Sequence, residues 1–274
     1  MRIKLALASL ASLALVIFPA TAFAGYAPSN RPTFQCITPT NCPGANYVVF
    51  NSFTNAVNYG DERAFFDAKD AAITTSGGYQ DSVPVHDGET VEMRVYVHNN
   101  ANPNAIGVAA ATAHNTTILV LLPTGAARTT QEAAAEISAS NANPANVSDT
   151  VDLTASTPFT VSLDSSSPVM VTYRPNGQGN YVTNTLPNVV FNGNSWSANV
   201  GDWKGCFNYA ALITFNAVVH MPTTPTPPVT PVTPVSKTTV LPNTGAGDVL
   251  GIFAGASAVG TAGHYFVARR RRRS

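Results

Sequence analysis

Two tryptophans stand in the polar stretch FNGNSWSANVGDWKG, whose composition suits contact with a sugar. Trp196 and Trp203 are accompanied there by Asn192, Asn194 and Asp202. An aromatic ring can stack on the apolar face of a sugar while amides and carboxylates hydrogen-bond its hydroxyl groups. The alternative, which we favour, is that one or both tryptophans fill the core, because a chain with few large side chains needs them inside.

Candidates for catalysis are few. None of the histidines has a partner at the spacing of a metal site or of a general base, and they are scattered along the chain: His86, His98, His114, His220 and His264. No Gly-x-Ser-x-Gly motif of a serine hydrolase occurs. We therefore predict a protein that is not an enzyme and that uses no cofactor and no metal.

The stretch GDERAFFDAKD gathers four acidic residues, Asp61, Glu62, Asp67 and Asp70. Carboxylates in such numbers can hold Ca²⁺, but the Asp-x-Asp-x-Asp-Gly order of a calcium loop is absent from the stretch. We expect a solvated acidic surface instead.

Three cysteines, Cys36, Cys42 and Cys206, leave an odd thiol in a chain with an export signal. Cys36 and Cys42 enclose the turn-rich ITPTN, and closing that loop would contribute roughly 2 to 2.5 kcal/mol. Pairing either one with Cys206 would contribute roughly 5 kcal/mol. Proximity favours the first pairing and stabilisation the second, and we expect Cys36–Cys42.

The C-terminal part of the chain combines an apolar segment with a cluster of arginines. Residues 249–268 carry almost no charge and match the length of a membrane-spanning helix. The tail 269–274, in which Arg269 to Arg273 are basic, follows directly, as in a cytoplasmic stop-transfer tail. We predict a transmembrane segment and a cytoplasmic tail. Before the chain is sorted, this C-terminal part is the only part of the protein expected to contact the membrane.

Just before this segment stands the pentapeptide Leu241-Pro242-Asn243-Thr244-Gly245. With the apolar span and the basic tail, it resembles the Leu-Pro-x-Thr-Gly sorting signal of sortase substrates in monoderm bacteria. The resemblance implies that the cysteine of a membrane sortase attacks the Thr244 carbonyl and releases the chain from Gly245 onward. The acyl group then passes to an amine of a cell-wall precursor. This protein would then be joined covalently to peptidoglycan through Thr244.

The N-terminus has the three regions of a secretory signal peptide, predicted over residues 1–24. Arg2 and Lys4 precede an apolar stretch, and Ala22 and Ala24 occupy the small positions of a cleavage site. Residues 25–45 form an N-terminal segment that contains two of the cysteines. Export and the sorting signal together predict an extracellular protein of the bacterial cell wall and cell surface.

Residues 221–240 consist almost entirely of Pro, Thr and Val, a composition that favours extended polyproline II structure. Such a stalk would reach on the order of 60 Å. Between the termini the acidic residues outnumber the basic ones, because much of the basic charge lies in the leader and the tail. A nucleic acid is therefore not an expected partner.

Residues 46–220 must form the folded body, and their periodicity is that of strands. Apolar side chains alternate with polar ones in two runs, at Val91, Met93, Val95 and Val97 and at Phe207, Tyr209, Ala211, Ile213, Phe215, Ala217 and Val219. The run TTILVLLP suits a central strand, and Asn176-Gly177 is typical of a type I′ hairpin turn. We predict an all-β, antiparallel sandwich, followed by the stalk and a C-terminal membrane helix.

Two segments are ambiguous. YGDERAFFDAKDAA could form a short helix that begins at Asp61. TTQEAAAEISAS has the capping box of a helix at Thr129 and Glu132, but we favour a strand there because its surroundings are β-rich.

The stretch DGETVEMRVYVHNN, followed by Leu122-Pro123-Thr124-Gly125, resembles the conserved repeat domain of bacterial cell-surface proteins. The resemblance implies an immunoglobulin-like module, in one or two units.

Three functional classes follow. The first is a wall-anchored surface protein that displays its sandwich for adhesion to, or recognition of, a protein or glycan on a host or neighbouring cell. The second is a subunit of a sortase-assembled fibre, with Lys69, Lys204 or Lys237 as acceptor, although none of them stands in a Tyr-Pro-Lys context. The third, a secreted hydrolase, lacks a set of catalytic residues.

Overall fold

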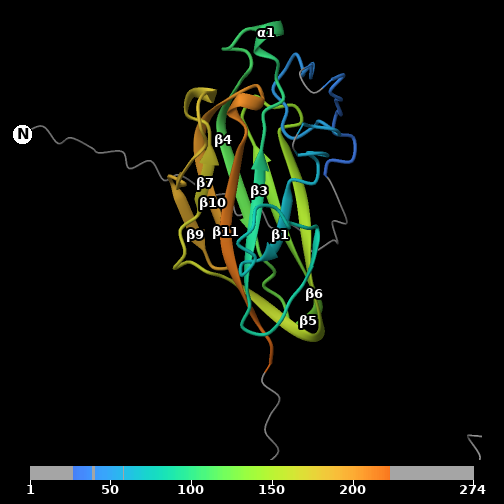
Figure 1. Ribbon diagram of the computed structural model, residues 1–274, viewed down its shortest axis with the longest axis vertical. Coiled ribbons are helices and arrows are strands. Elements are labelled where there is room, and N and C mark those ends of the chain that lie inside the picture. Colours follow the sequence, from blue (N-terminus) through green and yellow to red (C-terminus); the bar gives the residue numbers. More distant parts are fainter. Residues whose placement is uncertain (1–26, 39–40, 58, 223–274) are drawn as a thin grey trace, which may run out of the picture. The chain divides into compact units, whose positions relative to one another are not determined.

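Strands form nearly all the regular structure in residues 27–38, 41–57 and 59–222, the part of the chain that the computed structural model describes (Figure 1). The described strands are linked by hydrogen bonds into one sheet, and among them only β2 and β6 pair in parallel. The sheet folds over on itself into two layers, an arrangement consistent with an all-β sandwich.

The first layer has the strand order β2-β6-β5-β4-β10-β9. Its strands are β2 (Ser82–Pro84), β4 (Thr112–Leu121), β5 (Arg128–Ser138), β6 (Asn146–Leu163), β9 (Val189–Asn192) and β10 (Ser195–Lys204).

The second layer has the order β1-β3-β11-β7-β8. Its strands are β1 (Phe66–Asp70), β3 (Thr90–Val97), β7 (Met170–Tyr173), β8 (Val182–Thr185) and β11 (Ala211–His220).

Strand β6 belongs to both layers, and its 18 residues make it the longest described strand. Residues 146–154 pair with β5 in the first layer, whereas residues 160–163 pair with β11 in the second. The two layers are therefore joined along β6, while β9 and β8 form the opposite edges.

The core lies between the layers and follows the two-residue period of the strands. Alternate side chains of β11 are buried, from Ala211 to Val219, as are those of β3 from Val91 to Val97. The indole of Trp196 in β10 meets the ring of Phe215 in β11 edge to face, with 5.4 Å between the ring centroids. This contact joins the two layers directly.

Short helices interrupt the loops at one end of the strands. They are α1 (Pro103–Ile106) and two 3₁₀ turns, η1 (Pro175–Gly177) and η2 (Phe207–Tyr209). The turn η2 directly precedes β11, and Pro222 follows the end of β11. The turn η2 and Pro222 therefore lie at opposite ends of this strand, roughly 30 Å apart. Figure 1 shows α1 at the upper end and the last described residues below β11.

The structure decides both ambiguous segments in favour of strands. The short helix considered from Asp61 does not form, because residues Phe66–Asp70 form strand β1, paired with β3. The capping-box segment lies in β5, between β4 and β6, which confirms the strand we favoured. Hydrogen bonding to two neighbouring strands outweighs the local helix signal.

The predicted signal peptide, sorting motif, membrane segment and basic tail lie outside the described residues, as does the stalk from residue 223 onward. Among the helices of the described part, none is long and apolar enough to cross a membrane.

Candidate functional site

The two tryptophans of the polar stretch occupy different environments. Trp196 is completely buried in the core, which confirms the position that we favoured and removes it from the possible ligand platform. Trp203 is half-buried at the margin of the core. Strict alternation would place the two side chains on opposite faces of β10, but register shifts around Gly201 interrupt the pairing with β4 and change that alternation.

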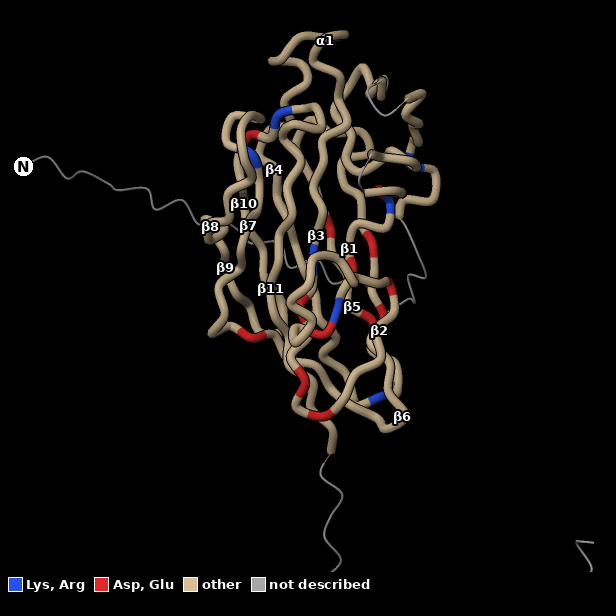
Figure 2. The backbone as a smooth tube through the Cα atoms, in the orientation of Figure 1, with Lys and Arg blue, Asp and Glu red and all other residues tan. Residues whose placement is uncertain are grey.

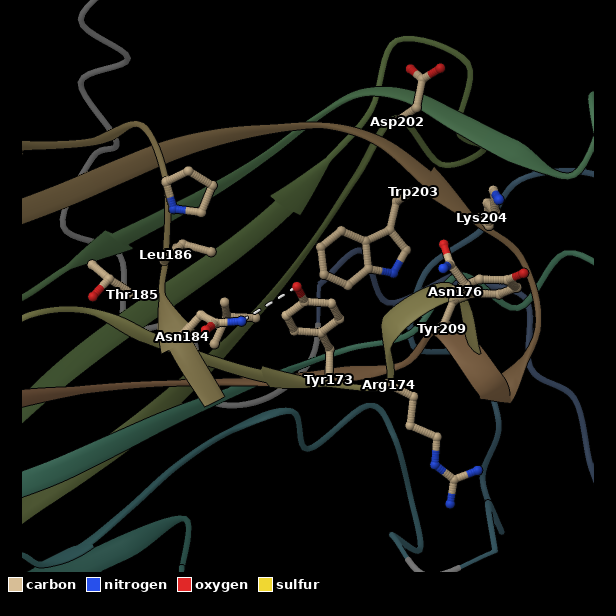
Figure 3. A pocket seen from close by; sticks show the side chains of 12 residues that line it. Tyr173, Arg174, Asn176, Asn184, Thr185, Leu186, Asp202, Trp203, Lys204 and Tyr209 are labelled. Carbon is tan, nitrogen blue, oxygen red and sulfur yellow. Dashed lines mark hydrogen bonds between the residues drawn. The ribbon is translucent and has the colours of Figure 1, made fainter. Parts of the chain in front are cut away.

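Trp203 lines an open cavity of about 500 Å³ (Figure 3). Three separate segments contribute to it: the end of β7 with η1, the end of β8 with the residues that follow it, and the end of β10 with η2. The lining consists of Val171, Tyr173, Arg174, Asn176, Asn184, Thr185, Leu186, Pro187, Asp202, Trp203, Lys204 and Tyr209. The cavity therefore lies where the β7–β8 hairpin of the second layer meets β10 of the first.

The turn η1 has the backbone that the Asn-Gly pair predicts, since Asn176 and Gly177 both have positive φ, of 53° and 71°. The hairpin itself differs from the prediction, because the loop between β7 and β8 is longer than a two-residue turn. A side chain at position 177 would meet the ring of Tyr209 at 2.9 Å, so glycine is needed for η2 to close against η1.

The cavity has an apolar floor and a polar rim. Val171 and Leu186 are buried beneath it, and Trp203 and Tyr173 stand together in its centre (Figure 3). Asn184 reaches the hydroxyl of Tyr173 with its amide nitrogen at 3.5 Å, a long hydrogen bond. Aromatic faces beside amide groups can hold a small amphipathic ligand.

Three charged side chains border the cavity. The Lys204 ammonium lies 5.3 Å from the ring centre of Tyr209, and the Arg174 guanidinium lies 4.6 Å from that of Tyr181. Asp202 accepts a contact from His114 Nδ1 at 3.0 Å, and both side chains remain exposed. Charges held this way at the surface are screened and mobile, so they tune selectivity more than affinity.

Two polar atoms at this site are buried without a hydrogen-bond partner among the described residues. They are Nε1 of Trp203 and Nε of Arg174. Buried donors are usually satisfied, so each unpaired donor carries a local energetic cost. Because both atoms are buried, neither is open to a ligand in the cavity.

No protein-family model, no curated protein and no solved structure matches the chain. The assignment of a function thus rests on the residues and their geometry.

The remaining polar residues of the tryptophan stretch lie outside the cavity. Asn192 is exposed at the end of β9. Asn194 is structural: its side chain accepts from Leu163 N at 2.7 Å and donates to the carbonyls of Pro123 and Val161 at 2.7 and 2.8 Å. It fastens the β9–β10 turn to the crossing strand β6 and to the end of β4.

A second hollow, of about 530 Å³, lies against the outer face of β3 and β11 and includes Tyr59, Arg94 and Tyr96. Its polar groups largely satisfy one another. Arg94 is paired with the Asp67 carboxylate, and the rings of Tyr59 and Tyr96 stack with centroids 4.0 Å apart. It therefore offers fewer open groups than the Trp203 cavity.

The acidic cluster is not the solvated surface that we expected. Asp61 pairs with Arg63 and Asp67 with Arg94, and Glu62 is completely buried. Across residues 27–222, outside the masked positions, no group of three or more His, Cys, Asp or Glu side chains is placed to hold a metal ion.

Glu62 instead anchors a buried polar network. One carboxylate oxygen lies 2.6 Å from His98 Nδ1, and the other accepts from the Asn100 amide at 2.8 Å. His98 is enclosed by aromatic rings, with that of Phe207 at 4.2 Å. The nearby Asn51 binds both the Tyr96 carbonyl and the His98 amide. This network joins residues 51–62 to the end of β3, which is a structural role.

Asp149 is a carboxyl group in a core-facing position of β6. It is 3% exposed and accepts the amide of Phe66 at 2.9 Å. Burial raises the pKa of Asp149 to about 7, although bonds from the backbone amides of Phe66, Thr150 and Phe65 oppose the shift. Asp149 fastens the start of β1 to the first layer.

The predicted disulfide is present. Cys36 and Cys42 are joined, and Cys206 is a free, half-buried thiol at the residue before η2. The sorting-motif residues Leu241, Pro242, Asn243, Thr244 and Gly245 lie outside the described part, with Ala22 and Ala24.

Sequence reasoning missed most of the cavity: Tyr173, Asn184, Leu186, Lys204 and Tyr209. These residues come from segments distant in sequence, so no linear motif connects them. The available signal was the Asn176-Gly177 turn, which brings β7 beside β8. Figure 2 shows Lys and Arg dispersed singly along the backbone, so charge did not mark the site either.

Proposed function

We propose that this protein is a surface protein of a bacterial cell wall, joined to peptidoglycan through Thr244 by a membrane sortase. The proposal is supported by the order of three features in the sequence. The pentapeptide 241–245 precedes the apolar span 249–268, and the basic tail 269–274 follows. A signal peptide over residues 1–24 supplies the export that this route requires.

We further propose that the body is an immunoglobulin-like sandwich whose role is recognition of a protein or glycan on a host or neighbouring cell. The observation that carries this is the position of the cavity. It lies beside η1 and η2, whereas the chain leaves the domain toward the stalk at Pro222, at the other end of β11. A domain anchored through residues 221–240 would carry its cavity on the end away from that attachment.

The fibre alternative depends on an accessible lysine. Lys69 is 8% exposed and contacts Glu92 at 3.3 Å, which makes it a poor acceptor for a bulky acyl-enzyme. Lys204 is exposed, and Lys237 lies outside the described residues. A fibre would appear as detergent-resistant ladders that disappear in Lys204→Ala or Lys237→Ala.

The anchoring is tested by mass spectrometry of wall material released with a muramidase. The expected C-terminal peptide ends at Thr244 and carries a wall-peptide fragment. The control is a chain that lacks residues 241–245 but keeps the span and the tail, and it should remain in the membrane fraction. Peptides that contain Arg269–Arg273 in most of the wall-bound protein would refute the proposal.

A further inference from the structure

We propose that the Trp203 cavity binds a neutral carbohydrate, with a pyranose ring stacked on the indole. This inference rests on the proposed recognition function and names the class of ligand. It concerns only the described residues around η1, so it does not depend on whether Thr244 is cleaved.

The shape and the apolar lining suit one or two sugar rings. The cavity of about 500 Å³ is open at the surface, and Val171 and Leu186 are buried at its base. Trp203 and Tyr173 provide aromatic surface beside them (Figure 3). The C–H face of a pyranose is apolar and packs on such rings, while its edges remain polar.

The polar groups around this surface match hydroxyl groups. Asn176, Asn184 and Thr185 are exposed at the rim, and an amide or hydroxyl both donates and accepts hydrogen bonds. The bond between Asn184 and Tyr173 is long, at 3.5 Å, so little is lost when a ligand replaces it.

The charges favour a neutral ligand over an acidic one. Lys204 and Asp202 flank Trp203 in the sequence, have opposite charges, and both line the cavity. The third charge, the Arg174 guanidinium, points away from the indole (Figure 3) and stacks on Tyr181. The space over Trp203 thus lacks the excess positive charge that would select a carboxylate or a sulfate.

The test uses the full-length chain, purified in mild detergent, on an array of neutral and acidic glycans. We expect binding to neutral hexose- or hexosamine-containing glycans. Trp203→Ala and Asn184→Ala should each weaken it about tenfold or more, the effect of losing roughly one good contact. Trp203→Phe should weaken it less, because it keeps an aromatic face.

Phe191→Ala is the matched control. Phe191 is an aromatic residue of β9, 40% exposed and outside the cavity lining, so its loss should leave binding unchanged. If circular dichroism shows that Trp203→Ala does not fold, the binding test rests on Asn184→Ala. Asn184 is exposed, so its replacement should leave the fold intact.

Three results would overturn the inference: no glycan bound, acidic glycans bound exclusively, or binding unaffected in both Trp203→Ala and Asn184→Ala. Glycan binding by a chain that is not linked to the wall would remove the anchoring proposal and leave this inference standing. A wall-linked chain that binds no glycan would remove this inference and leave the anchoring proposal standing.

Discussion

Replacement of Trp196 by Ala should destabilise the domain far more than the same change at Trp203. Trp196 is fully buried and forms the edge-to-face contact with Phe215 that joins the two layers. Truncating a buried tryptophan costs about 3 to 5 kcal/mol in free energy of unfolding. The unpartnered Nε1 of Trp196 disappears with the ring, which places the cost toward the lower part of that range.

Trp203 is half-buried and borders the cavity, so we expect its loss to cost about 1 to 2 kcal/mol. Thermal unfolding followed by circular dichroism separates the two. For a domain of this size, Trp196→Ala should lower Tm by about 6 to 20 °C and Trp203→Ala by only a few degrees. Trp196→Phe should lie between wild type and Trp196→Ala, because it keeps part of the contact with Phe215. A Trp196→Ala protein that melts with the wild type, or that melts above Trp203→Ala, would refute the assignment of Trp196 to the core.

Three further predictions test other parts of the fold. The folded pKa of Asp149, about 7, lies above its unfolded value, so the native state holds the proton more tightly, and the free energy of unfolding should fall by up to about 4 kcal/mol as pH rises from 4 to 7. In urea unfolding, Asp149→Asn should make this free energy less dependent on pH across the same window. An unchanged pH dependence in the variant would contradict the prediction. Asn194→Ala should cost about 2 to 4 kcal/mol in urea unfolding, since it removes bonds to Leu163, Pro123 and Val161, whereas Asn192→Ala, at an exposed position, should stay within about 0.5 kcal/mol. Iodoacetamide should label only Cys206 in the unreduced protein and all three cysteines after reduction, as read by intact mass; labelling of Cys36 or Cys42 before reduction would contradict the disulfide.

The strands with a clear two-residue period were predictable from sequence. Val91 to Val97 and Ala211 to Val219 alternate in the sequence and are buried alternately in β3 and β11. Phe207 and Tyr209, which we predicted to begin the second run, lie instead in the 3₁₀ turn η2. The apolar run TTILVLLP lies largely in β4, between β5 and β10, as expected of a central strand. These strands can be recognised from the sequence because one face of each packs on the core.

Two strands were hidden because charged or polar side chains occupy positions that tertiary contacts cover. In β1, Asp67 and Lys69 look solvent-exposed in the sequence, but Arg94 and Glu92 of β3 pair with them. In β6, the core-facing row includes the carboxyl of Asp149, and the strand serves both layers in turn. Local sequence does not record which partners neutralise a charge, so these two strands were not predicted.

The proposed sorting signal can be recognised in the sequence, whereas the cavity cannot. A sorting signal is read as an extended peptide, so its residues must be adjacent and in order, and the pentapeptide 241–245 is visible without a fold. The cavity is assembled by pairing β7 with β8, by the positive φ of Gly177 and by the register shifts near Gly201. Each of these is a property of the folded chain. The two proposals therefore rest on separate residues, and a failure of one in experiment would leave the physical argument for the other intact.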